Sequence, residues 1–162
     1  MSFKNILCFG TLNPDLIYFV DELPTKGGDI RSLKSSMRPG GTAINCSELI
    51  SLWKKSVQVI GNIIGNDPMG KYLVDYLKEN NINFDGLIIN QSLTPTCSIF
   101  VDSSGERTIV SSGYEGLEWS NFENLNNFDS LIIDRYSIRL SLIHISEPTR
   151  PRLISYAVFC LK

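Results

Sequence analysis

Asparagine, aspartate and glycine residues stand at spacings that suit a ligand rich in hydroxyl groups. Two of them, Asn13 and Asp15, come shortly after the first apolar run of the chain. Three more form the stretch that leads into a helical pattern: Gly40, Gly41 and Asn45. An amide both donates and accepts hydrogen bonds and a carboxylate accepts them, which matches the needs of a sugar hydroxyl. Glycine lacks a Cβ, so the backbone of the glycine pair can approach a ligand closely.

The start of the helix after the glycine pair is a second candidate feature. We expect Thr42 to cap this helix and Asn45 to lie in its first turn. Free backbone N–H groups and the positive end of the helix dipole would favour oxygen-rich ligands there. Each motif also has a simpler interpretation, because a Gly-Gly pair before a helix is commonly a turn, and Asn13-Pro14-Asp15 is a typical turn sequence.

Composition narrows the class of protein. The chain has 162 residues, 43% of them hydrophobic, and a formal net charge of -2, which suits one globular domain and argues against a nucleic-acid partner. The single histidine, His144, cannot build a His-based metal site or a catalytic triad. The four cysteines form no Cys-x-x-Cys pair, so we expect buried free thiols. Neither a signal peptide nor a membrane-spanning run is predicted, and we expect a cytoplasmic protein.

Apolar runs alternate with helical patterns along the chain. Buried strands are predicted at residues 6–9, 57–60, 84–90 and 130–134. One helix begins at the glycine pair, and a second follows the loop around Asp67, its predicted cap, and continues to about Lys78. This alternation predicts an α/β fold with a parallel central sheet.

Additional extended segments interrupt this pattern. Residues 16–20 and 30–37 flank a Pro-Gly turn, and residues 96–102 and 107–111 flank a second turn that is typical of a hairpin. We expect the two pairs to join in a small sheet that projects from the main body.

The ordered set of motifs resembles the ribokinase-like carbohydrate kinases. The motifs are Gly10-x-x-Asn13-x-Asp15, Gly40-Gly41-x-x-x-Asn45, Gly65-x-Asp67-x-x-Gly70 and Gly105-Glu106-Arg107-Thr108. The resemblance covers the amino-terminal half of that family and implies its three-layer fold, truncated, with the projecting sheet as a lid. It gives residues 1–139 as a partial kinase domain.

The resemblance also implies an activity, namely transfer of the γ-phosphoryl group of ATP, with Mg²⁺, to a hydroxyl of a sugar or nucleoside. By this likeness the substrate would be held by Asn13, Asp15, Gly40, Gly41 and Asn45. Further contacts from the lid or a strand end would come from Ile99, Arg107 and Asp134. The lid sheet would also support a homodimer.

The family's catalytic base belongs to a Gly-Ala-Gly-Asp motif that this sequence does not contain. We therefore nominate no catalytic residue and no metal ligand, and expect the chain to be inactive alone. Residues 140–162 depart from the family pattern and resemble translated sequencing adapter. The alternative is a genuine tail with an apolar strand at residues 153–161, which would cover an exposed sheet edge.

The sequence also bears on two alternative classes of function. A non-catalytic ligand-binding or dimerising α/β module fits the self-contained alternation of strands and helices. A nicotinamide-dependent dehydrogenase is disfavoured, because the glycine spacing does not match the Gly-x-Gly-x-x-Gly fingerprint.

Overall fold

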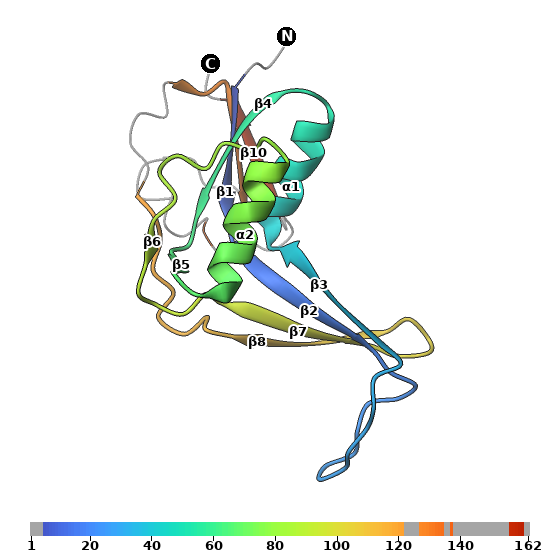
Figure 1. Cartoon of the computed structure of the whole chain (residues 1–162). Coiled ribbons are helices and arrows are strands. Elements are labelled where there is room, and N and C mark those ends of the chain that lie inside the picture. The colour runs from blue at the N-terminus through green and yellow to red at the C-terminus, as the bar shows by residue number, and fades with distance from the viewer. Residues whose placement is uncertain (1–4, 122–126, 135–136, 138–155, 161–162) are drawn as a thin grey trace, which may run out of the picture.

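The structure is a computed structural model that describes residues 5–121, 127–134, 137 and 156–160. Its central sheet has the strand order β10-β9-β1-β4. Strand β1 (Asn5–Gly10) lies parallel to β4 (Ser56–Gly61) on one side and to β9 (Ser130–Asp134) on the other. The predicted parallel α/β fold is therefore confirmed (Figure 1).

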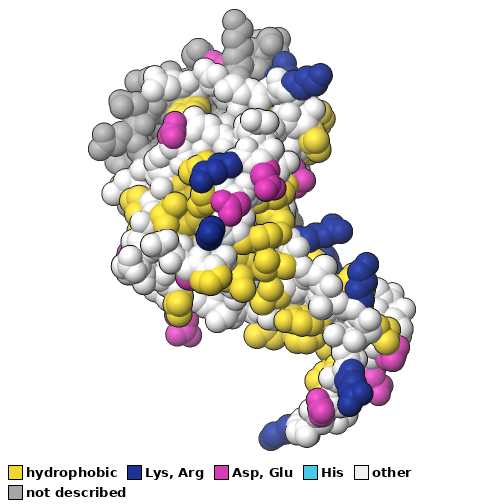
Figure 2. All heavy atoms as spheres, viewed as in Figure 1, with side chains coloured by type: hydrophobic (Ala, Val, Ile, Leu, Met, Phe, Trp, Pro, Cys, Tyr) yellow, Lys and Arg dark blue, Asp and Glu magenta, His cyan; other side chains and the backbone are white. Residues whose placement is uncertain are grey.

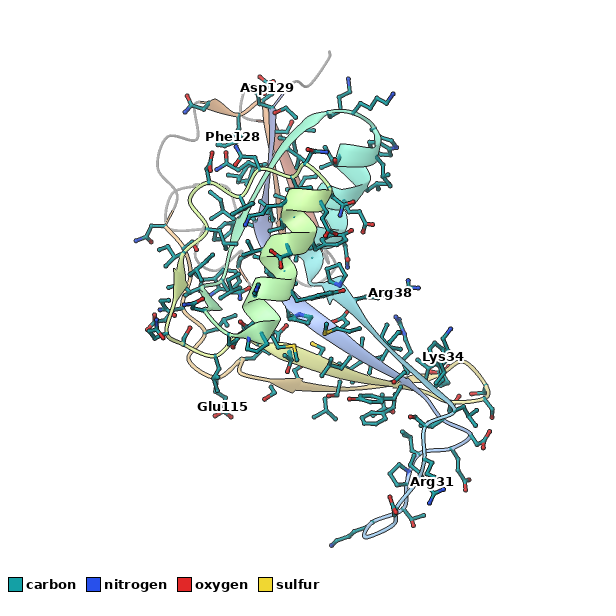
Figure 3. All side chains as sticks on the ribbon, viewed as in Figure 1. Arg31, Lys34, Arg38, Glu115, Phe128 and Asp129 are labelled. Carbon is teal, nitrogen blue, oxygen red and sulfur yellow. The ribbon has the colours of Figure 1, made fainter. Side chains whose placement is uncertain are left out.

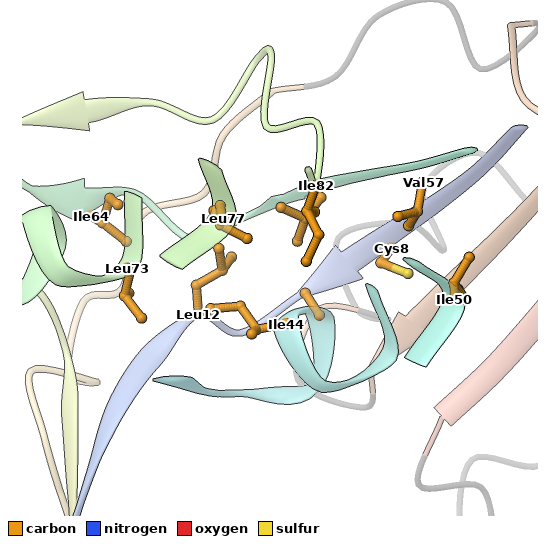
Figure 4. Packing of buried hydrophobic residues seen from close by; sticks show 11 residues of the cluster. Cys8, Leu12, Ile44, Ile50, Val57, Ile64, Leu73, Leu77 and Ile82 are labelled. Atoms are coloured by element: carbon orange, nitrogen blue, oxygen red, sulfur yellow. The ribbon is translucent and has the colours of Figure 1, made fainter. Parts of the chain in front are cut away.

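Both described helices cover one face of the central sheet. Helix α1 (Thr42–Leu52) and helix α2 (Pro68–Glu79) pack against the face that carries Cys8, Val57 and Val59. Figure 4 shows how Ile44 and Ile50 of α1 meet these strand residues, with Leu73 and Leu77 of α2 alongside. Burial of such side chains contributes about 1.5 to 3 kcal/mol each, so this layer holds the helix start in place.

The opposite face of the sheet has a smaller core. It joins Leu7, Phe9, Ile60, Leu131 and Ile133. The side chains of Trp119 and Phe128, which come from the connection before β9, pack against it. In the described part of the chain this third layer is therefore built by loop residues, whereas both helices lie on the first face.

A second sheet, called the lid sheet below, projects from the body as predicted (Figure 1). It has the order β3-β2-β7-β8, formed by β2 (Asn13–Phe19), β3 (Lys34–Gly40), β7 (Thr96–Val101) and β8 (Arg107–Ser112). Strands β2 and β7 are parallel, and the other pairs are antiparallel. Figure 3 shows Arg38 where β3 reaches the body, and Lys34 and Arg31 farther out along the projection.

Strand register assigns the candidate residues to one face of the lid sheet. Alternate residues point to the same face, so Asn13 and Asp15 share a face with Ile17. Asp15 stands between Arg38 and Cys97, and Cys97 pairs with Ser111, which makes a polar row nearest the body.

Three expectations about local structure were wrong. Asn13-Pro14-Asp15 is the beginning of β2 and not a turn, because its backbone pairs with residues 38–40 of β3. The predicted third core strand at 84–90 is reduced to β6 (Ile89–Asn90), which pairs with β5 (Ile64–Gly65). Its apolar residues Ile88 and Ile89 are 41% and 43% exposed, so the apolar run did not mark a buried strand.

The third correction concerns α1. The residue that precedes the helix as its N-cap is Gly41, and no side chain caps it, whereas Thr42 is the first helical residue. Leu49 and Leu52 on this helix are apolar but 49% and 72% exposed. The buried residues of the helix are Ala43, Ile44, Ser47 and Ile50.

Within the tail, a strand is present where the apolar run predicted one. Strand β10 (Tyr156–Cys160) lies antiparallel to β9 and covers its outer side. The remainder of the tail, including His144, lies outside the described residues.

Candidate functional site

The candidate site lies where β1 ends and the lid sheet begins. Asn13 is 2% exposed, and its Nδ2 donates to Oδ1 of Asp15 at 2.7 Å. The hydroxyl of Tyr114 donates to Oδ1 of Asn13 at 2.9 Å. Both ends of the Asn13 amide are therefore occupied, and this residue orients Asp15 and is not itself open to solvent.

Both positions of the pair favour glycine, because the Asp15 carboxyl at Gly40 and the Thr11 backbone at Gly41 occupy the space of a Cβ. A Cβ on Gly40 would lie 2.3 Å from Oδ2 of Asp15. A Cβ on Gly41 would lie 2.1 Å from the carbonyl oxygen of Thr11 and 3.0 Å from Oδ1 of Asn13. Gly41 also has φ of 87°, which side chains disfavour. The glycine pair and the Asn13–Asp15 pair, distant in sequence, therefore pack against each other.

The Asp15 carboxyl is half-buried, and its protonation is shifted accordingly. Burial raises the pKa of Asp15, and the hydrogen bond from Asn13 opposes this by lowering the pKa. The balance leaves the pKa above its usual value, so the charged form is poorly solvated and gains from additional hydrogen-bond donors.

The start of α1 is not a set of free donors, contrary to expectation. The N–H groups of Thr42 and Ala43 donate to Oγ1 and the carbonyl oxygen of Thr11, each at 3.3 Å. Asn45 follows one turn later, with its N–H bonded to the carbonyl of Gly41 at 3.1 Å, and it is exposed. At this helix start, Asn45 thus offers a solvent-accessible amide beside the glycine pair.

Asp134 and Asn62 fix the connection between β1 and β2. Asp134 is 1% exposed, and its Oδ2 accepts from the N–H and Oγ1 of Thr11 at 2.8 and 3.1 Å. Its Oδ1 accepts from the N–H and hydroxyl of Ser137 at 2.8 and 2.7 Å. Asn62, fully buried, bonds both the N–H and the carbonyl of Leu12 at 2.7 and 3.1 Å. These contacts make Asp134 a support for the site in this structure.

Ile99 and Arg107 lie farther from the glycine pair along the lid. Ile99 pairs with Ile17 and Ile109 on the face that carries Asp15. Arg107 is exposed and pairs with Val101 at the outer end of the hairpin. The structure therefore brings Ile99 one row from Asp15, and places Arg107 a further row away.

The predicted cap of α2 is confirmed. Oδ1 of Asp67 accepts from the N–H of Gly70 at 2.7 Å, and its Oδ2 accepts from the N–H of Thr94 at 2.8 Å. Burial raises the pKa of Asp67, but the hydrogen bonds from Thr94, Gly70 and Met69 together outweigh it, so the pKa is lowered. The Gly65-x-Asp67-x-x-Gly70 motif joins α2 to the loop before β7.

Sequence reasoning missed Tyr114, Asn62 and Thr11, which hold the site residues. Their partners lie 101, 50 and 123 positions away, in the pairs with Asn13, Leu12 and Asp134 respectively. No local pattern marks such contacts, and only the Gly113-Tyr114 step after the hairpin hinted at a change of chain direction.

Cys8, Cys46 and Cys97 are free thiols, as expected, and burial raises the pKa of Cys8 and Cys46. No group of three or more His, Cys, Asp or Glu in the described residues could hold a metal ion. Among the described helices, none is long and apolar enough to cross a membrane.

A parallel sheet, a second sheet that projects from it and a glycine-led helix beside an Asn-Asp pair define the class of the chain, an α/β protein with a polar site where the two sheets meet. The sequence model of the pfkB family carbohydrate kinases matches residues 4–144. The chain belongs to this family.

Individual relatives agree with this assignment. The chain is 29% identical to the ribokinase of Dictyostelium discoideum over 108 residues, which is 66% of this chain and 34% of that protein. It is 30% identical to the ketohexokinase of Mus musculus over 112 residues, 68% of this chain and 37% of that protein. The chain thus spans about a third of the length of these curated relatives.

Solved structures show the same fold. The ribokinase of Cryptococcus neoformans, solved in complex with ADP, superposes with a TM-score of 0.67 at 21% identity over 93% of this chain and 47% of that one. The expected ribokinase-like fold is therefore confirmed.

Proposed function

We propose that this chain carries the substrate-binding and lid part of an ATP-dependent kinase that phosphorylates a hydroxyl of a sugar or nucleoside. The observation that carries the proposal is the close packing of the glycine pair against Asn13 and Asp15. At this junction a half-buried carboxylate, Asp15, and an exposed amide, Asn45, adjoin backbone without side chains. Family membership supports the reaction class.

Each residue has a distinct task in this proposal. Asp15 accepts hydrogen bonds from two hydroxyls of the substrate, which compensates the burial of its charge. Asn45 donates and accepts at a further hydroxyl. Gly40 and Gly41 leave room for the substrate ring, and the Ile17–Ile99–Ile109 row of the lid covers its apolar side and excludes water.

ATP and Mg²⁺ belong to the family reaction, and bound nucleotide would supply the phosphoryl group. The described residues do not fit them: they contain no metal-binding cluster, and the first two N–H groups of α1 are taken by Thr11. In the proposal, the catalytic base and the nucleotide cradle belong to a Gly-Ala-Gly-Asp segment that this chain lacks, so the chain alone does not catalyse transfer.

The same proposal gives residues 1–139 as the kinase part and residues 140–162 as a non-family tail. It also includes a cytoplasmic location.

A calorimetric titration tests the substrate site. The 162-residue chain is titrated with ribose, fructose and adenosine, and we expect one of them to bind. Asn45→Ala should weaken that binding about tenfold, the effect of one lost hydrogen bond to a ligand. Asn66→Ala is the matched control, since Asn66 is also an exposed asparagine beside a helix start, at α2. Equal affinities in the two variants, or phosphoryl transfer by the chain alone, would contradict the proposal.

A homodimer through the lid sheet is part of the same proposal. In the described residues β8 is the outer strand of that sheet, and Ile109 and Val110 are 52% and 57% exposed on it. Figure 2 shows hydrophobic side chains gathered where the lid leaves the body. Sedimentation equilibrium should show a dimer that Val110→Lys, on the face of β8 that does not carry the Ile17–Ile99–Ile109 row, converts to a monomer.

The alternative is a non-catalytic ligand-binding module. Strand β10 favours it, because among the described residues β10 pairs with the outer side of β9 and the central sheet has four strands. The test uses a longer chain that continues the reading frame of this one. If that chain binds the sugar but transfers no phosphoryl group, the result supports this alternative.

A further inference from the structure

The contact between Tyr114 and Asn13 has no place in the substrate tasks assigned above. Tyr114 follows β8 by two residues and is half-buried, and its hydroxyl lies 2.9 Å from Oδ1 of Asn13. Oδ1 of an amide only accepts, so the tyrosine hydroxyl is the donor. The amide is thereby oriented with Nδ2 toward Asp15, where it donates at 2.7 Å.

We propose that Tyr114 is a positioning residue: carried on the end of a lid strand, it fixes the Asn13 amide so that this amide holds the Asp15 carboxylate in place for the substrate. The proposal rests on the proposed sugar site. It adds a residue that touches no substrate and acts through Asn13.

The chain path explains why a lid residue reaches the site. Gly113 has φ of 78°, and a Cβ there would lie 3.1 Å from the Cα of Pro95, so glycine allows the chain to turn back closely at the end of β8. The Tyr114 hydroxyl also lies 3.6 Å from Sγ of Cys97. It is therefore seated between β2 and β7, and a movement of the lid that displaces β8 would change the contact to Asn13.

Loss of this hydroxyl has a defined electrostatic consequence. Without the tyrosine hydroxyl, Oδ1 of Asn13 is a buried acceptor that has lost its donor. Rotation of the amide toward another donor would then lower the free energy of the folded state. The hydrogen bond to Asp15 is then weakened. Because that bond lowers the pKa of Asp15 while burial raises it, the pKa of Asp15 should rise. Other titratable groups that flank Asp15 are Arg38 on β3 and Cys97 on β7, and of these only Cys97 is affected, because it loses its 3.6 Å contact with the Tyr114 hydroxyl.

The test is Tyr114→Phe, with Tyr18→Phe as the matched control. Tyr18 lies on the other face of the same sheet, with its ring stacked on Phe100 at 5.4 Å, so its variant also loses one phenolic hydroxyl. Carbon-13 NMR titration of the Asp15 carboxyl should show a higher pKa in Tyr114→Phe and no change in Tyr18→Phe. This readout needs no ligand, so it stands or falls independently of sugar binding.

Binding supplies the second readout. If the chain binds a sugar, Tyr114→Phe should weaken the affinity about tenfold and move the acid limit of binding to higher pH. An unchanged Asp15 pKa in folded Tyr114→Phe would overturn the proposal. If that variant does not fold, the wild-type chain provides the test. We expect a nuclear Overhauser contact between the Tyr114 ring and the Asn13 side-chain amide, and its absence would also overturn the proposal.

Discussion

Replacing Gly41 by alanine tests the packing on which the site depends. The residue has φ of 87° and ψ of 151°, a region that is essentially limited to glycine, and a side chain there costs about 1 to 3 kcal/mol. The added Cβ would also lie 2.1 Å from the Thr11 carbonyl oxygen. Overpacking of this kind costs a further amount of about 1 to 3 kcal/mol.

The clash at Gly41 is not easily relieved. Thr11 is held by Asp134 through its N–H at 2.8 Å and its Oγ1 at 3.1 Å, so its carbonyl can move only if those bonds are strained. We therefore expect Gly41→Ala to lose about 2 to 6 kcal/mol of unfolding free energy, a large part of the 5 to 15 kcal/mol that is typical of a domain.

Urea unfolding followed by circular dichroism measures this loss. Gly105→Ala is the matched control, because Gly105 has φ of 86° but nothing within 4 Å of its Cβ position. It should lose only the conformational part, about 1 to 2 kcal/mol. If the two variants lose the same free energy within about 0.5 kcal/mol, the close approach of Gly41 to Thr11 contributes nothing and the reasoning is refuted.

Two further predictions use the same elements. Gly40→Ala places a Cβ 2.3 Å from Oδ2 of Asp15, a side-chain atom that can rotate away. We therefore expect the sugar affinity to fall about tenfold or more, and the free energy of unfolding to fall less than in Gly41→Ala. Calorimetry and urea unfolding measure the two effects, and an unaltered sugar affinity would contradict the prediction. Asp67 has a lowered pKa in the folded chain, so its stabilising effect is present above the ordinary carboxyl pKa and is lost as the pH falls through its folded value. Asp67→Ala should lose about 1 kcal/mol at pH 7, the usual cost of removing a helix cap, and this deficit should shrink in acid; an equal deficit at pH 7 and in strong acid would contradict the assignment.

Much of the architecture followed from local sequence. Short apolar runs ending in glycine marked β1 and β4, and Ser103-Ser104-Gly105-Glu106 between alternating segments marked the β7–β8 hairpin. Asp67 was recognised as a cap because capping needs only the few residues that follow it. These features depend on neighbours close in the chain, which the sequence contains directly.

Segments whose conformation depends on residues distant in sequence were predicted less well. The 84–90 run has the apolar character of a strand, but only Ile89–Asn90 finds a parallel partner, so most of it is not sheet. Asn13-Pro14-Asp15 resembles a turn by composition, yet pairing with β3 extends it, because the backbone hydrogen bonds of β3 are available there.

By itself, then, the sequence determined the order of strands and helices, the lid segments and the identity of the polar and glycine residues at the candidate site, since these are matters of residue type and local spacing. Only the tertiary structure decided how the residues act on one another. In the structure, Asn13 is hydrogen-bonded to both Tyr114 and Asp15, Thr11 accepts from the first N–H groups of α1, and Asp134 is buried beside Thr11. Those contacts join positions up to 123 residues apart, and their distances arise from the packing of whole elements, which no local pattern encodes.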